Sequence, residues 1–402
     1  MKKICCLLLI ILIAFNLTGC WDSDELNELG IIMGIAIDKD TTSGKVIITS
    51  EIVNPSSLSK QSPSGKSTIE YVTTDGNTVT EAINATTKEF DRKNLLSHIK
   101  VFVISEEVAR CGVNDIVDFI ARSNDIRRFT SFVVAKGSSA REILGVNGGI
   151  DKIQANYMSS IIKEQITNLD VAAPNFFDFL KKMPGDRINP VAGVFGIVMK
   201  NNLPAEQKSN SIDKVDKLIG AAAFKKDKLV GFLDYSETRG YNFIIDDNHK
   251  GIYNIPSSKQ DNKYLSIYME KFRTKITPFY INAHISYNID VKLEASIVQV
   301  SDASDVSNLK EFNDLNYTVS EYVEKDIKKT LSKIQKELKT DILGFGGCFY
   351  RKYPKEWKII KNQWNDLFPT VNVSVKVKTK LKRTGLLLKP LDGVKENKID
   401  FK

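Results

Sequence analysis

Hydrophobic and polar positions alternate with different periods along the chain, and each period predicts an element. Apolar runs at Ile31–Lys39 and Val46–Val53 flank a polar turn at 41–44, which is typical of a β-hairpin. Further strand-like runs lie at 69–73, 95–105, 129–135 and 191–199. Segments with helical spacing separate them, at 79–90, 113–123, 140–144, 153–169 and 175–182. This succession predicts an α/β or α+β domain.

Hydrophobic periodicity disappears at 201–217, a stretch rich in Asn, Ser, Asp and Lys that is predicted to be a linker. The pattern resumes with a second predicted hairpin, Leu218–Phe224 and Lys228–Leu233, and with alternating strands across Ile276–Ile297. Two helical stripes follow, one over Val319, Val323, Ile327, Leu331, Ile334 and Leu338, the other over Trp357, Ile360, Trp364 and Leu367. Both tryptophans are therefore expected in a core rather than in a ligand cage.

The strictest alternation is at Val371–Arg383. One face of this segment holds Val371, Val373, Val375, Val377, Thr379 and Leu381, and the other holds four lysines. A period of two predicts a strand with one buried and one solvent-exposed face, of the kind common in antiparallel sheets. The lysines are expected to hinder pairing with another chain at an exposed edge.

The first twenty residues carry a targeting signal. Lys2 and Lys3 precede an apolar run of about 14 residues, shorter than the roughly 20 that a membrane-spanning helix needs. Leu17-Thr18-Gly19-Cys20 then has the pattern of a lipobox, whose cysteine sulfur accepts a diacylglyceryl group. We expect cleavage after Gly19, with S-diacylglyceryl and N-acyl groups on Cys20. The alternative, an incidental cysteine after an ordinary signal, is disfavoured because all four positions fit.

Together these patterns predict an α+β fold, a multi-domain ectodomain with mixed or antiparallel sheets and packed helices behind a lipidated N-terminus. The length of 402 residues suits two or three domains. The expected divisions are a removed signal peptide at 1–19, an N-terminal domain at 20–200, the linker at 201–217, a C-terminal domain at 218–390 and a polar tail at 391–402.

Charge is distributed unevenly. The segment from Lys325 to Lys402 holds 20 Lys and Arg against 8 Asp and Glu, whereas the whole chain has a net charge of +8. On a membrane-tethered protein such a basic end suits anionic lipid or an acidic partner. A solvated face is the third interpretation, and all three stay open at this point. Nucleic acid is not expected as a partner outside the cell.

Residues suited to metal binding are scattered. The three histidines are far from one another and from any cysteine in sequence: His98, His249 and His284. Asp38 and Asp40 resemble the start of a calcium loop, but Ser43 and Thr49 stand where that loop needs Gly and Glu. We therefore expect no metal site and no cofactor.

Motifs for catalysis are equally sparse. Gly344-Phe345-Gly346-Gly347 lacks a dinucleotide-binding spacing and follows a predicted helix, so a turn is expected there. Glu237 and Arg239 are predicted to make structural ion pairs, because no nucleophile or base accompanies them. Whether Cys111 and Cys348 form a disulfide is open. The prediction is a protein that is not an enzyme.

Five segments occur in a specific order. They are CWDSDELNELGIIMGIAIDKD at 20–40, SHIKVFVISEEVAR at 97–110, DFIARSNDIRRFTSFVVAKGSSAREIL at 118–144, GAAAFKKDKLVGFLDYSETRG at 220–240 and DILGFGGCFYRKYPKEWKIIKNQWNDLFPTVNVSVKV at 341–377. In this order, behind a lipobox, they resemble the Ger(x)C family, the lipoprotein C subunits of spore germinant receptors. The resemblance spans nearly the whole mature chain.

The resemblance implies a lipoprotein on the outer face of the inner spore membrane of an endospore-forming bacterium. It implies work with two membrane-embedded partners, the A and B subunits of a nutrient germinant receptor, and a non-enzymatic α+β ectodomain whose two domains are C-subunit domains. Only Cys20 carries over as a functional residue. Direct binding of a germinant by this subunit stays open.

Two other classes of protein remain as alternatives. A lipid-anchored solute-binding protein of a transporter has the same anchor, but such proteins have two doubly wound lobes around a cleft, which the alternation at Val371–Arg383 does not favour. A hydrolase that acts on the cell wall is disfavoured, because the sequence shows neither a set of metal-binding residues nor a nucleophile motif.

Overall fold

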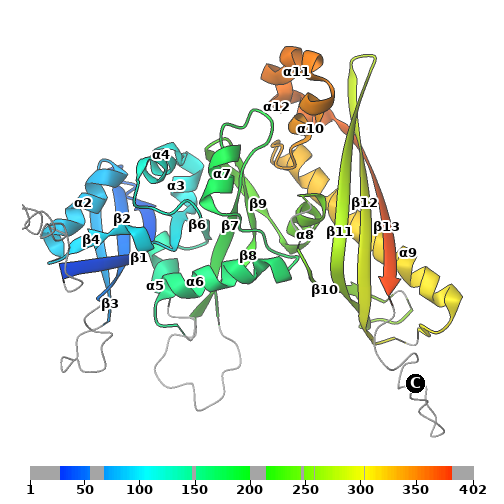
Figure 1. Cartoon of the computed structure of the whole chain (residues 1–402), viewed down its shortest axis with the longest axis horizontal. Helices are drawn as coiled ribbons and strands as arrows, with labels where there is room; N and C mark the ends of the chain where they lie inside the picture. Colours follow the sequence, from blue (N-terminus) through cyan, green and yellow to red (C-terminus); the bar gives the residue numbers. More distant parts are fainter. Residues whose placement is uncertain are drawn as a thin grey trace, which may run out of the picture.

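The computed structural model describes residues 28–54, 68–146, 151–199, 214–245, 249–257, 259–302 and 304–382. The predicted signal peptide, the lipobox with Cys20 and the polar tail lie outside these residues. Two sheets follow one another along the long axis of the molecule, with the N-terminal half at one end and the C-terminal half at the other (Figure 1). The predicted α+β class with mixed sheets is confirmed.

Within the described residues the first sheet has nine strands, in the order β3-β2-β1-β5-β6-β7-β8-β9, with the short β4 beside β1. Strands β1, β5, β6 and β7 are mutually parallel, and the outer pairs are antiparallel. The bounds are β1 Leu29–Lys39, β2 Val46–Val53, β3 Ile69–Gly76, β4 Lys93–Leu95, β5 Val101–Ser105, β6 Ser131–Lys136, β7 Val191–Met199, β8 Lys214–Lys225 and β9 Lys228–Leu233.

Helices cover both faces of this sheet, as parallel strands require. One core lies under α2 Val79–Glu89, α3 Glu106–Cys111, α4 Asn114–Arg122 and α7 Phe176–Lys182. A second core lies on the opposite face, under α5 Ala140–Gly145 and α6 Gln154–Lys163. The central strands are therefore buried on both sides, which explains why their sequences are continuous apolar runs instead of alternating ones.

Two details of this half differ from the sequence prediction. The run at 95–105 is not one strand, because a 3₁₀-helix at Leu96–His98 separates β4 from β5, and His98 lies in that turn. Strand β8 begins at Lys214, inside the predicted linker, and pairs with β7 through Met199↔Lys214 and Ile197↔Asp216. The first sheet thus contains strands from both sides of the stretch 201–213.

The second sheet has four described strands in the order β10-β11-β12-β13. Their bounds are β10 Gly251–Pro256, β11 Tyr264–Ile281, β12 His284–Val300 and β13 Asn372–Lys382. The predicted alternation in β13 is confirmed, with Val377 and Leu381 buried and the lysines exposed. Its pairing, however, is parallel to β12 rather than antiparallel, because the chain returns through a long helical connection.

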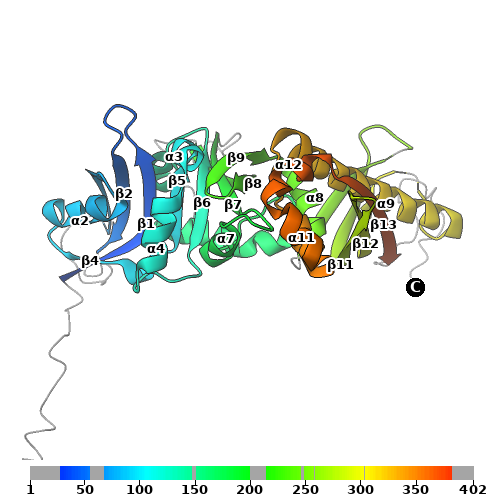
Figure 2. The ribbon, with the colours of Figure 1, turned by 90° about the horizontal axis from the view of Figure 1, so that it is seen from above.

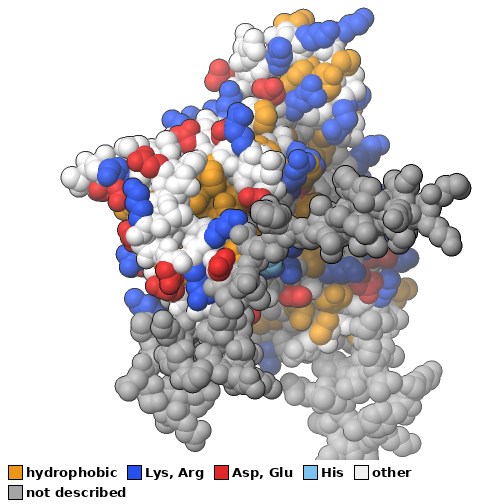
Figure 3. Space-filling view, turned by 60° about the vertical axis from the view of Figure 1, so that its left-hand side comes forward, with side chains coloured by type: hydrophobic (Ala, Val, Ile, Leu, Met, Phe, Trp, Pro, Cys, Tyr) orange, Lys and Arg blue, Asp and Glu red, His pale blue; other side chains and the backbone are white. Residues whose placement is uncertain are grey.

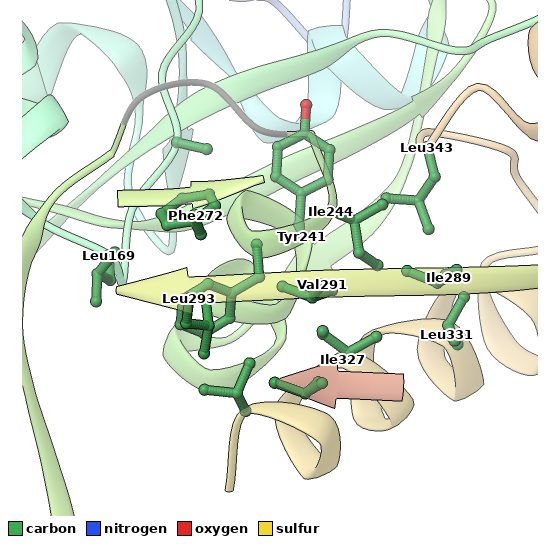
Figure 4. Close-up of a cluster of buried hydrophobic side chains, with 14 of the residues drawn as sticks. Leu169, Tyr241, Ile244, Phe272, Ile289, Val291, Leu293, Ile327, Leu331 and Leu343 are labelled. Carbon is green, nitrogen blue, oxygen red and sulfur yellow. The ribbon is translucent and has the colours of Figure 1, made fainter. Parts of the chain in front are cut away.

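The helices of this half are α8 Tyr235–Ile245, α9 Leu309–Ser332, α10 Phe345–Lys352, α11 Pro354–Ile360 and α12 Trp364–Leu367, and short 3₁₀ turns at 361–363 and 368–370 flank α12. A π-helical turn at Lys333–Glu337 extends α9. Among the described residues, helices pack on one face of the second sheet: Ile289, Val291 and Leu293 of β12 point toward α8 and α9 (Figure 4). Trp357 and Trp364 are buried, with ring centroids 5.4 Å apart, so their predicted core role is confirmed.

The two doubly wound lobes of a solute-binding protein are not found in the described part of the chain. The first sheet carries helices on both faces, but the second is mainly antiparallel and packed on one face. In Figure 2, seen from above, the helices α11 and α12 lie beside the second sheet. The fold does not support that alternative.

Candidate functional site

The residues considered for chemistry in the sequence are not brought together. Within the described ranges, no group of three or more His, Cys, Asp or Glu side chains is placed to hold a metal ion. Asp38 instead accepts hydrogen bonds from Ala140 N (2.8 Å) and Arg141 N (2.9 Å), and so caps α5. Both Cys111 and Cys348 are free thiols, which answers the question of their pairing.

The glycine-rich turn at 344–347 forms the N-terminus of α10, and a carboxylate of the chain itself occupies it. Asp341 accepts hydrogen bonds from the backbone N–H of Gly344 (2.8 Å), Phe345 (3.1 Å) and Gly346 (2.8 Å). The indole Nε1 of Trp364 donates a fourth at 3.1 Å. Gly344 has a left-handed φ of 77°, which lets the chain turn back over the carboxylate.

This arrangement resembles an anion site that has been filled from within. Burial raises the pKa of Asp341 above its ordinary value, and the four hydrogen bonds act in the opposite direction. Since all four donors point at one buried side chain, the turn has no open position for a phosphate. The predicted turn is instead the N-cap and the first turn of helix α10, and the buried acid that organises it was not foreseen.

A second polar cluster joins the two halves of the chain. The Arg239 guanidinium of α8 bonds Asp170 through Nη1 (2.5 Å) and Asp326 of α9 through Nε (2.6 Å). The Tyr253 hydroxyl of β10 donates to Asp326 at 2.8 Å, and the guanidinium lies 4.5 Å from the Tyr253 ring centroid. The predicted structural ion pair of Arg239 is therefore confirmed. Glu237 makes no ion pair among the described residues, contrary to the prediction; it accepts a hydrogen bond from Asp234 N and stabilises the start of α8.

A cavity adjoins the Arg239 cluster at Asp170. It has a volume of about 630 Å³ and lies between the end of α6 with its following 3₁₀ turn, strand β8 and the start of α8. Its polar lining includes Tyr157, Glu164, Asp170 and Lys217, and neither His nor Cys is among the lining residues. The lining can therefore contact a small molecule, and its ionisable side chains are carboxylates, a lysine and tyrosines.

Asp216 of β8 adjoins this cavity and is fully buried. Its carboxylate oxygens have no hydrogen-bond donor among the described residues, although the Gln154 side chain is near enough to lower the pKa slightly. Burial dominates and raises the pKa of Asp216 to about 6. No sequence signal marked this acid, because it lies in the polar stretch 201–217 that was predicted to be a linker.

Replacing Asp216 by asparagine is expected to stabilise the protein at pH 7.5 by about 1–2 kcal/mol. With a folded-state pKa near 6 and an ordinary value of 3.8, the native state binds more protons between these values. Stability then falls as pH rises from about 4 to 6, by about 1.4 kcal/mol for each unit of pKa difference. Asparagine cannot ionise and so removes this loss of stability, but its buried amide also needs hydrogen-bond partners. The gain in the free energy of unfolding is therefore smaller than the full pKa difference would give.

Urea unfolding of both proteins at pH 4 and pH 7.5 checks this expectation. The difference between variant and wild type should be near zero or negative at pH 4 and positive at pH 7.5. A difference that does not change between the two pH values would contradict a buried, ionising Asp216.

A third acid missed in the sequence is Glu51 of β2. Its fully buried carboxylate accepts hydrogen bonds from Gln154 N (2.7 Å), Ala155 N (2.9 Å) and the Tyr71 hydroxyl (3.0 Å). Burial raises the pKa of Glu51, and these donors oppose the shift. A lone acid within the apolar strand VIITSEIV was the available signal. Its role is to hold the N-terminus of α6 on the sheet.

Comparisons with known proteins agree on one group. The family model described as "Spore germination protein N-terminal domain" matches residues 22–197, and "Spore germination B3/ GerAC like, C-terminal" matches residues 219–385. Spore germination protein KC of Bacillus subtilis (strain 168) is 28% identical over 96% of this chain and 97% of its own length. Spore germination protein B3 of the same organism is 24% identical over 92% and 95%.

A solved structure shares the fold. The crystal structure of the GerBC protein superposes with a TM-score of 0.55 at 18% identity, over 87% of this chain and 96% of the other. In the part of the chain that the structure describes, none of the helices has the length and apolar character needed to cross a membrane.

Proposed function

Because the chain belongs to the Ger(x)C family of spore germination proteins, we propose that it is the membrane-anchored lipoprotein subunit of a spore nutrient germinant receptor. In this role it is required for germination triggered by nutrients and acts as a non-enzymatic scaffold. The observation that carries the proposal is the succession of the two family domains, at 22–197 and 219–385, directly behind the lipobox at 17–20.

The buried acids support a scaffold role. Asp341, Asp326 and Glu51 each accept several hydrogen bonds from the chain itself and hold helices in place. Their carboxylates serve the fold and are not directed at a substrate. The partners that we propose are the membrane-embedded A and B subunits of the receptor.

We propose that the protein lies on the outer face of the inner spore membrane, where acyl chains on Cys20 hold it. Each buried methylene of such a chain contributes about 0.8 kcal/mol, and two or more chains give stable attachment where one is marginal. A diacylglyceryl group with an additional N-acyl chain therefore suffices to retain the protein without a membrane-spanning helix.

Spores whose only copy carries Cys20→Ala are expected to lose most of the protein from the membrane fraction and to respond weakly to nutrients. Contacts with membrane-embedded partners should keep a small fraction of the protein at the membrane, because a tethered assembly raises the effective concentration of its members. Fractionation, with mass spectrometry of the mature N-terminus, measures the first effect, and the loss of optical density after nutrient addition measures the second.

Two controls complete the test. Spores lacking the gene should fail to germinate with the nutrient, and both strains should still germinate when nutrients are bypassed by lysozyme treatment. Full nutrient germination of the deletion strain, in a background without a paralogue, would refute the receptor role. Unchanged membrane retention of Cys20→Ala at high salt, in the absence of A and B subunits, would refute the lipid anchor.

A further inference from the structure

One face of the second sheet is not covered by any helix in the described part of the chain. Figure 1 shows α9 crossing behind β11, β12 and β13, and the inner side chains of these strands pack on it. Because successive residues of a strand point to opposite faces, the remaining positions point away from the helices. In the middle of the sheet these outward residues are Lys271, Arg273 and Lys275 of β11, Lys292, Asp290 and Glu294 of β12, and Lys376, Lys378 and Lys380 of β13.

The register arranges these nine residues in three rows across the strands. One row is Lys271, Glu294, Lys380, and another is Lys275, Asp290, Lys376. Each has an acid at its centre with a lysine on either side. The middle row is Arg273, Lys292, Lys378, three cations on adjacent strands with no acid between them. We call this middle row the cationic row.

The cationic row is unfavourable for folding. Like charges directly opposite each other on neighbouring strands destabilise a sheet. No carboxylate among the described residues lies within 4.0 Å of these three charges, whereas Lys382 at the end of the same face bonds Glu270 (2.6 Å) and Glu294 (3.3 Å). The positive charge at the end of the sheet is thus neutralised by ion pairs, whereas the charges at its centre are not. An external anion would compensate the charges at the centre.

A groove lies over this centre. Its volume is about 520 Å³, and its charged lining consists of Arg273, Lys275, Lys292, Lys376, Lys378 and Asp290. Five positive charges against one negative charge therefore surround a space open to solvent. Strands lie about 4.8 Å apart, so the backbones of the cationic row span about 10 Å across the sheet.

The other end of the molecule has a different surface. Figure 3 brings the end formed by the first sheet forward, and Lys and Arg side chains are interspersed there with Asp and Glu. Several of those charges are paired, as in Lys45–Asp75, Arg110–Glu106 and Arg122–Asp118. The basic character is therefore concentrated on the second sheet.

The composition of the rows favours a lipid surface over a protein partner. Protein interfaces concentrate aromatic residues at a packed centre and are depleted in lysine. The three rows contain six lysines, one arginine and no aromatic residue. An anionic bilayer needs no shape complementarity, and each Lys or Arg near it raises the affinity about fivefold.

We propose that the outer face of β11–β13, centred on the cationic row, binds the anionic headgroups of a phospholipid surface. The proposal rests on the proposed function in that it assumes a chain attached beside a membrane. Headgroup phosphates lie over Arg273, Lys292 and Lys378 and relieve their mutual repulsion. The sheet is thereby held against the bilayer at a second point, remote in sequence from the anchor.

The test uses the chain from residue 20 to its end, with Cys20→Ala so that no acyl chain contributes. Sedimentation with vesicles containing phosphatidylglycerol is compared with pure phosphatidylcholine vesicles. The protein is expected to bind only the anionic vesicles, and added salt should weaken the binding. The variant Arg273→Gln/Lys292→Gln/Lys378→Gln should bind about 100-fold more weakly. It should unfold at the same or a higher urea concentration, because the like charges are gone.

A matched variant removes one arginine and two lysines from exposed positions of the other half: Arg127→Gln/Lys88→Gln/Lys152→Gln. It should bind anionic vesicles nearly as the wild type does. Equal loss in both variants, or equal binding to neutral vesicles, would overturn the proposal.

Two competitors identify the source of the anion. Displacement by millimolar inorganic phosphate at constant ionic strength would reassign the groove to a free anion. Binding of soluble polyglutamate without binding of anionic vesicles would reassign it to an acidic protein. Because Cys20 is replaced throughout, these outcomes do not depend on whether the lipid anchor exists.

Discussion

Replacing Asp341 by alanine is expected to lower the free energy of unfolding by about 4 kcal/mol. The carboxylate is only 2% exposed and accepts from three backbone N–H groups and from Trp364 Nε1. Without it, four donors lose their acceptor in the interior, and each such donor costs about 1–3 kcal/mol. The total destabilisation is smaller than the sum of these four costs, because water can enter the vacated space and accept some of the hydrogen bonds.

Urea unfolding followed by tryptophan fluorescence measures this effect, since Trp364 touches the site directly. Asp341→Asn should be intermediate, because its oxygen still accepts while its NH₂ group faces the remaining donors. Asp366→Ala serves as the matched control: Asp366 is exposed on the neighbouring helix α12 and should cost little. If Asp341→Ala lowers the free energy of unfolding by less than about 1 kcal/mol, the turn forms without the Asp341 carboxylate.

Replacing Arg239 by alanine is expected to cost about 3–5 kcal/mol. The side chains of Arg239 and Asp326 are 18% and 10% exposed, so the substitution leaves a nearly buried carboxylate with only the Tyr253 hydroxyl as partner. It also frees Asp170 from α8, at the junction between the two sheets. Breaking one member of a buried pair is costly chiefly because the other charge stays desolvated.

The matched control is Arg122→Ala, which removes an i,i+4 pair with Asp118 on the exposed surface of α4. That pair is worth less than about 1 kcal/mol and is weakened by salt. Arg239→Lys should be intermediate, since a single ammonium cannot bond both aspartates in the forked geometry of a guanidinium. Equal losses for Arg239→Ala and Arg122→Ala in urea titrations would disprove the structural importance of the buried cluster.

The elements themselves could be predicted because each has a clear hydrophobic period. The β1–β2 hairpin, the strand β13 and the long helix α9 occur where their patterns indicated. The direction of β13 could not be predicted, since one buried face is compatible with parallel or antiparallel pairing. The extent of the first sheet was also missed, because nothing in the residues of β8 says which strand it will join.

The candidate sites were harder to predict than the fold. Asp341, Asp216 and Glu51 are ordinary acids in sequence, and only tertiary packing removes them from water. The cationic row is a second example: Arg273, Lys292 and Lys378 lie far apart along the chain and meet only through the register of three strands. Sequence composition indicated an excess of positive charge but not the surface on which it gathers.

The pairing of β7 with β8 has a consequence for building chimaeras within this family. The two family models meet between residues 197 and 219, so a crossover placed there would join β7 from one parent to most of β8 from another. The resulting ladder would combine side chains that were never selected to pack together. A crossover after Leu233 would transfer the hairpin of β8 and β9 with the sheet to which it is hydrogen-bonded.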